Sequence, residues 1–216
     1  AGKMSAAVGG LKEIVRTSAT INPAPAGTIT TVETMRAACV AGAPGVNVIP
    51  VTFTSSTMAA QFETFSRDTS GEGRDDLDMV LVNSAGTLVT YSANDGSDEW
   101  ITLAAPAPGN YRLCVIGYNT ANNQPATYGF HSAIVTTSDK GGNFKALVPA
   151  KVYAGGKATI PVSWAGLASN KRYLGAVRLL DNNNAVGSTT VVQVETNQPI
   201  PVADRGQRAK AKDTGI

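Results

Sequence analysis

The stretch that decides the fold reads Gly73-Arg74-Asp75-Asp76-Leu77-Asp78-Met79-Val80-Leu81-Val82, and it continues through Asn83-Ser84-Ala85-Gly86 into Thr87-Leu88-Val89. Acidic residues precede an apolar run of strand length, and a turn separates that run from a second one. A strand, a turn and a second strand of this kind are typical of an antiparallel β-sandwich. The remaining elements can be assigned outward from this unit.

The carboxylates before this strand suggest a metal site. Asp75, Asp76 and Asp78 fall within four residues, and charges so close together repel one another unless a cation or backbone N–H donors compensate. Calcium takes oxygen ligands of this type, and Asp68 and Asp98 are candidates to complete the set. The alternative is a polar, solvated loop that binds no metal. The sequence leaves both open, and calcium coordination is carried forward as a prediction.

Composition favours an all-β protein without electrostatic partners. Only 16% of the 216 residues are charged, and Thr, Val, Gly, Asn and Pro are frequent, as in short strands joined by tight turns. The net charge of +2 is too small to indicate binding to nucleic acid or to a membrane surface. No apolar run reaches the roughly 18 residues of a membrane span, and the start lacks the features of a signal peptide, so we expect a processed fragment.

Strand-length segments recur along the chain and predict one large, jelly-roll-like sandwich over residues 28–137. The predicted strands are 28–32, 37–41, 46–54, 59–65, 79–82, 88–92, 99–103, 111–118 and 127–135. The alternation is clear in the segment 111–118, where Tyr111, Leu113 and Val115 share one face. That face is expected to line the core.

The two cysteines, Cys39 and Cys114, lie in apolar, strand-like contexts. We predict a disulfide between them, which would stabilise the fold by about 4 kcal/mol in an oxidising compartment. Cys114 alternates away from the core-facing residues of its strand, so the bond should lie toward the outside of the sandwich. Two buried free thiols are the alternative.

A second, smaller sandwich is predicted over residues 138–202, separately folded behind a glycine-rich hinge at 138–142. Its strands are expected at 145–148, 158–164, 172–180 and 189–194, with Trp164 as a core residue. Residues 1–27 carry a Pro-Ala run and are expected to be a linker or a remnant of a preceding region. Residues 203–216 are expected to be a disordered tail.

The sequence does not indicate an enzyme. Its one histidine, His131, lies on the strand face opposite Tyr128 and Phe130, and we interpret it as a solvent-facing strand residue. No nucleophile elbow, zinc-type spacing or phosphate-binding glycine loop is present. Binding by exposed aromatics is the other possibility, with Trp100, Tyr91 and Tyr118 as candidates, although packing in the core or at its rim explains the same residues.

Residues 51–135 resemble the pre-peptidase C-terminal domain that accompanies secreted subtilisin-like serine peptidases of bacteria. The landmarks are Phe62-Glu63-Thr64-Phe65, Asp75-Asp76-Leu77-Asp78, Asn83-Ser84-Ala85-Gly86, Gly96-Ser97-Asp98-Glu99, Pro106-Ala107-Pro108-Gly109-Asn110-Tyr111 and Gly117-Tyr118. The later segments Val162-Ser163-Trp164-Ala165-Gly166-Leu167 and Arg172-Tyr173-Leu174-Gly175-Ala176-Val177 resemble the fibronectin type III-like module that closes many of these peptidases. Met79 and Val80 depart from the family, which often has Leu and Tyr there.

This resemblance implies a non-catalytic C-terminal accessory region of a secreted, extracellular serine endopeptidase. Its catalytic residues would belong to a preceding domain, so none is assigned to this chain. The implied partners are the catalytic domain and a protein substrate, and the implied roles are stability, substrate docking or maturation. Related domains bind calcium, which agrees with the carboxylate cluster. An independent adhesion or carbohydrate-binding module is the alternative function.

Overall fold

The computed structural model describes residues 2–196, and the fold is all-β, as the composition predicts. The strands are β1 (Ser5–Glu13), β2 (Val15–Ile21), β3 (Val46–Phe53), β4 (Thr57–Thr64), β5 (Asp76–Asn83), β6 (Leu88–Ser92), β7 (Glu99–Ala104), β8 (Gly109–Asn119), β9 (Ala126–Thr136), β10 (Lys145–Ala146), β11 (Val162–Ser163), β12 (Arg172–Leu180) and β13 (Val186–Glu195). The helices are α1 (Val32–Ala41), η1 (Ser66–Asp68) and η2 (Ala121–Asn123). Among the described residues, no helix has the length and apolar character needed to cross a membrane.

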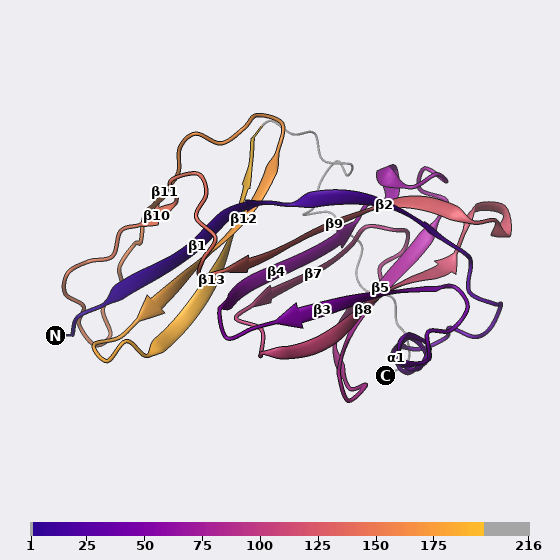
Figure 1. Cartoon of the computed structure of the whole chain (residues 1–216), viewed down its shortest axis with the longest axis horizontal. Helices are drawn as coiled ribbons and strands as arrows, with labels where there is room; N and C mark the ends of the chain where they lie inside the picture. The colour runs from indigo at the N-terminus through magenta and orange to yellow at the C-terminus, as the bar shows by residue number, and fades with distance from the viewer. Residues whose placement is uncertain (1, 197–216) are drawn as a thin grey trace.

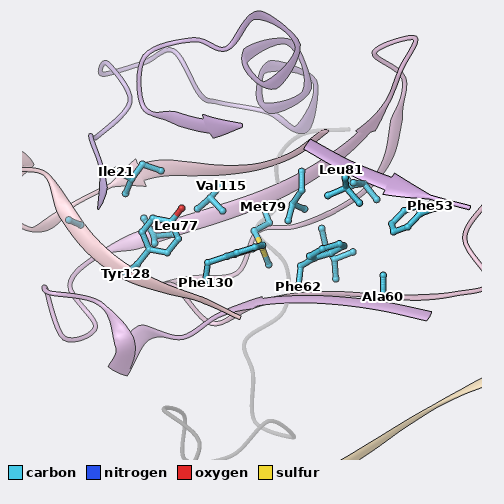
Figure 2. Packing of buried hydrophobic residues seen from close by; sticks show 14 residues of the cluster. Ile21, Phe53, Ala60, Phe62, Leu77, Met79, Leu81, Val115, Tyr128 and Phe130 are labelled. Carbon is cyan, nitrogen blue, oxygen red and sulfur yellow. The ribbon is translucent and has the colours of Figure 1, made fainter. Parts of the chain in front are cut away.

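The first unit is a sandwich of two antiparallel four-stranded sheets. One sheet has the strand order β2-β9-β4-β7, and the other has the order β3-β8-β5-β6 (Figure 1). Alternate residues of each strand point into the layer between the sheets, where Phe62 and Phe130 from one sheet meet Met79 and Leu81 from the other (Figure 2). The predicted strands from residue 46 to residue 135 all occur, and most end within two residues of the predicted bounds.

The predictions of strands at 28–32 and 37–41 are wrong, because this region forms a loop and helix α1. Thr31 is the N-cap, and its hydroxyl accepts from the amide of Thr34 while the Thr34 hydroxyl accepts from the amide of Thr31. Gly42 ends the helix in the left-handed conformation at φ 61°. These caps and the alanines of the helix outweigh the local strand-like pattern.

The Cys39–Cys114 disulfide joins α1 to the outer face of the sheet β3-β8-β5-β6. Cys114 lies with Val80, Val82 and Ile116 beneath the helix, whereas Leu113 and Val115 face the central core. The bond therefore lies outside the main core, as predicted. Cys39 is on helix α1 and not on a strand.

The second unit is built from both ends of the described chain. Its sheet has the order β1-β12-β13, and the short pair β10-β11 lies beside it. The sequence predicts a linker or a remnant of a preceding region at residues 1–27, but this part of the chain supplies β1 to the second unit and β2 to the first. Of the expected strands, 172–180 and 189–194 occur within β12 and β13, while 145–148 and 158–164 shrink to two residues each in β10 and β11. The tail at 203–216 lies outside the described residues.

The two units meet across a buried apolar interface. Met58, Ala59 and Val135 of the first unit pack against Leu174 and Ala176 of the second. The contact is close, since a Cβ atom placed on Gly9 would come within 2.7 Å of the carbonyl oxygen of Thr136. This packing disagrees with the prediction of a flexible hinge at 138–142 between separate modules. The domain boundaries and the fibronectin type III-like assignment stay predictions.

Candidate functional site

Buried charged residues gather on the outer face of the sheet β2-β9-β4-β7, where the second unit covers it. Phe62 points into the core, so its neighbour Glu63 points outward. In the register of the sheet Glu63 lies opposite His131, and His131 lies opposite Arg16. Three titratable side chains from three strands thus form a row across the sheet.

Glu63 forms a buried ion pair with Arg172 of the second unit. The distance from Nη2 of Arg172 to Oε2 of Glu63 is 2.5 Å, and both side chains are 1% exposed. Nε of Arg172 lies 3.6 Å from Oε1 of Glu195, and its guanidinium lies 5.3 Å from the centre of the Phe65 ring. One arginine therefore contacts two carboxylates and an aromatic face, which is the geometry that suits a planar guanidinium.

Asp68 forms the second part of the site. Its two carboxylate oxygens accept hydrogen bonds from Nε and Nη2 of Arg16, each at 2.8 Å. Nε2 of His131 lies 2.7 Å from Oδ2 of the same carboxylate, and the imidazole packs edge-on against the Phe65 ring at 4.9 Å between centroids. The Phe65 ring thus contacts both the His131 imidazole and the Arg172 guanidinium.

Burial and hydrogen bonding shift the pKa values in this site. Burial lowers the pKa of His131 below its usual 6.5, although the hydrogen bond to Asp68 acts in the opposite direction. Burial alone would raise the pKa of Asp68, but hydrogen bonds from Arg16 and His131 outweigh it and the pKa falls. Asp68 is therefore ionised at neutral pH, and His131 is predominantly neutral.

We call Arg16, Glu63, Asp68, His131 and Arg172 the charged network. The sequence places His131 on the outer strand face correctly, but the prediction that it faces solvent is wrong because it is only 4% exposed. The sequence alone predicts no role for Glu63 or Arg172. The local pattern gave no signal for either residue, because Glu63 falls on the polar face of the alternating segment Gln61-Phe62-Glu63, where a charged side chain ordinarily faces solvent.

The chemistry of the network is ion pairing and hydrogen bonding, within the first unit for Arg16, Asp68 and His131 and across the interface for Glu63 and Arg172. An acid that orients an imidazole also occurs in hydrolases, where the imidazole in turn contacts a nucleophile. Within the described residues, the hydrogen bond recorded for the His131 ring is the one to Asp68. The observed contacts hold η1, β2 and β9 together through Asp68, and they hold β12 against β4 through the Glu63–Arg172 pair.

The five carboxylates predicted to bind calcium are dispersed among different partners. Asp75 is buried and accepts from the amides of Gly71 at 2.7 Å and Ala121 at 2.9 Å, and Asp98 accepts from the amide of Ser66 at 2.8 Å. Asp78 is buried on β5, Asp76 is half-buried on the same strand, and Asp68 belongs to the charged network. In the part of the chain that the structure describes, no three acid, histidine or cysteine side chains are arranged to hold a metal. Calcium binding stays a prediction.

The candidate aromatic residues do not form one row. Trp100 is on the sheet β2-β9-β4-β7, while Tyr91 and Tyr118 are on the other sheet, and Tyr91 packs against the cluster beneath α1. Tyr118 borders a hollow of about 330 Å³ lined by the Pro-Ala run. Trp164, predicted to be a core residue, follows the two-residue strand β11 and is 45% exposed, so that prediction is wrong.

One comparison with known proteins finds a partial similarity to a protease. No family model matches this chain. The chain is 35% identical over 68 residues to pyrolysin of Pyrococcus furiosus, a match that covers 31% of this chain and 5% of the relative. A crystal structure of Bacillus licheniformis lipase BlEst2 in propeptide form aligns with 76% of this chain and 40% of that one, at 12% identity and a TM-score of 0.31. The chain therefore spans a small part of the protease that it matches, and it is similar in part to a subtilisin-like protease.

Proposed function

We propose that this chain is a non-catalytic accessory region of a secreted subtilisin-like serine endopeptidase, and that it acts as a rigid brace for the catalytic domain. The partial similarity to pyrolysin and the resemblance to the pre-peptidase C-terminal domain support the protease association. The proposal depends on one observation above the others, the buried Glu63–Arg172 ion pair that joins the two units.

A brace must resist bending, and the interface supplies that resistance. Separating the units would expose the apolar cluster around Leu174 to water. It would also break the Glu63–Arg172 ion pair. An arginine held by two carboxylates and a ring also fixes orientation more closely than apolar packing does. The two units therefore move as one body, which is the property that a brace needs and a flexible docking arm does not.

The test is to produce the parent endopeptidase with and without this region. Hydrolysis of a short peptide should keep its kcat/KM, since the brace does not contact the reacting atoms, while the half-life of thermal inactivation should shorten without the region. The isolated chain should not cleave a protein substrate. An unchanged half-life would contradict the brace, and cleavage by the isolated chain that His131→Ala abolishes would contradict the non-catalytic assignment.

The carbohydrate-binding alternative receives less support. Sugar-binding faces usually present several coplanar aromatics, and Trp100 and Tyr118 lie on different sheets. The hollow beside Tyr118 carries a single aromatic side chain. Retention of the chain on insoluble polysaccharide, lost in Tyr118→Ala, would favour that alternative over the brace.

A further inference from the structure

The positive charge of this protein is concentrated in one segment. From residue 140 to residue 180 the chain contains no Asp or Glu and seven basic residues, Lys140, Lys145, Lys151, Lys157, Lys171, Arg172 and Arg178. The segment therefore carries a charge of +7, and the rest of the chain carries −5 because the total is +2. The small net charge hides a strong asymmetry between the two parts of the chain.

Three of these lysines lie on an exposed loop. The pair β10-β11 closes the loop, which we call the basic loop and define as residues 145–164. It has little regular structure, and every residue from 153 to 159 is exposed. Figure 1 shows β10 and β11 at the end of the molecule farthest from α1, so the basic loop lies away from the first unit.

The lysines of the basic loop form no ion pair within the described residues, unlike Lys171 and Arg172 of the same segment. Lys171 pairs with Glu13 at 3.0 Å, and Arg172 belongs to the charged network. Within the described residues, Lys145, Lys151 and Lys157 form no ion pair, and all three are exposed. Their charge is available to an anionic partner.

The same loop exposes large apolar side chains. Leu147 is 71% exposed, Tyr153 is 66% exposed and Trp164 is 45% exposed. A hydrogen bond from the Leu147 amide to the Pro161 carbonyl joins the two ends of the loop, so these side chains belong to one surface region. Tyrosine and tryptophan are the side chains that settle at the boundary between lipid headgroups and acyl chains. A leucine cannot stack on a sugar ring as an aromatic can, but it gains from contact with acyl chains.

We propose that the basic loop docks on an anionic lipid surface, with Lys145, Lys151 and Lys157 at the headgroups and Leu147, Tyr153 and Trp164 at the level where acyl chains begin. The interaction is peripheral and spans no bilayer. It goes beyond the proposed function, because it would hold the endopeptidase at a cell surface whether or not the region braces the catalytic domain. Basic residues beside exposed aromatic and aliphatic side chains are the combination that such binding requires.

Co-sedimentation of the full chain with lipid vesicles tests the proposal. We expect binding to vesicles of phosphatidylcholine with 30% phosphatidylglycerol, weaker binding to phosphatidylcholine alone, and release by 0.5 M NaCl. Lys151→Gln with Lys157→Gln should lower the partition coefficient about thirtyfold. Leu147→Ser with Tyr153→Ser should lower it about tenfold or more.

Matched variants on the first unit serve as controls. Arg67→Gln with Arg74→Gln removes the same charge from exposed positions outside the basic loop, and it should leave the partition coefficient within about twofold of the unmodified chain. In a Trp100→Phe chain, Trp164 is the remaining tryptophan, and its fluorescence should shift to shorter wavelength with anionic vesicles. No vesicle binding would overturn the proposal. So would equal losses in the loop and control variants, or binding to soluble anionic polysaccharide alone.

Discussion

Replacing Glu63 by glutamine tests the role of the charged network most sharply. The substitution preserves shape but leaves Arg172 without its nearest carboxylate, at a place where both side chains are 1% exposed. Breaking a buried pair by removing one partner costs about 3–5 kcal/mol. Arg172 retains Glu195 at 3.6 Å and the Phe65 ring at 5.3 Å, so we expect a loss near the lower limit, about 3 kcal/mol.

Urea denaturation followed by tryptophan fluorescence and by far-UV circular dichroism measures this loss. The matched control is Lys171→Gln, which breaks an exposed pair with Glu13 whose side chains are 45% and 43% exposed, and which should cost less than about 1 kcal/mol. Replacing both partners, as Glu63→Leu with Arg172→Met, should recover most of the stability because no charge is then left buried alone. If Glu63→Gln proved as mild as Lys171→Gln, the reasoning from burial would be refuted.

Three further predictions concern pH, the disulfide and calcium. Burial holds the pKa of His131 below 6.5 in the folded protein, so the unfolded chain binds a proton first as the pH falls. The free energy of unfolding should therefore be highest above about pH 6.5 and should decrease below it, and the decrease should be smaller in His131→Gln. Equal pH profiles of the unfolding free energy in the unmodified chain and in His131→Gln would contradict this prediction. The Cys39→Ala and Cys114→Ala double variant should lose about 4 kcal/mol in urea, since the bond spans 75 residues, and an unchanged midpoint would contradict the loop-entropy argument. Calcium binding by Asp75, Asp76 and Asp78, with Asp68 or Asp98, would raise the free energy of unfolding by about 2.7 kcal/mol at a hundredfold excess of calcium over its Kd. Equal melting midpoints with calcium and with chelator would contradict this prediction and would leave the hydrogen bonds from the amides of Gly71 and Ala121 as the contacts that hold the Asp75 carboxylate in its loop.

The first sandwich was predictable because its strands carry their own signal. In β8 the residues Leu113 and Val115 face the core, and the alternation alone identifies that face. The position of Cys114 outside the core follows from the same alternation. Strands of this kind are specified locally, so the sequence predicts them without knowledge of their partners.

The elements that were missed are specified by distant partners. β1 contains small residues such as Gly9 and Gly10, and it is a strand because β12, more than 160 residues later in the chain, pairs with it. His131 is buried because Phe65, Asp68 and the second unit cover its face of the sheet. The sequence pattern near His131 does not show which distant residues cover it. The charged network joins residues that are far apart in the chain, so it could not be predicted from local sequence either.

Hydrogen exchange of the native chain is the measurement that tests most directly whether the two units form one rigid body. Amides of β4 in the first unit and of β12 in the second lie on opposite sides of the interface that contains the Glu63–Arg172 pair. If the units unfold together, the slowest amides of both strands should exchange with the same free energy of opening, and Glu63→Gln should lower both equally. Amides of β12 that open well below those of β4, with only β12 affected by Glu63→Gln, would show two independent modules and would contradict the brace.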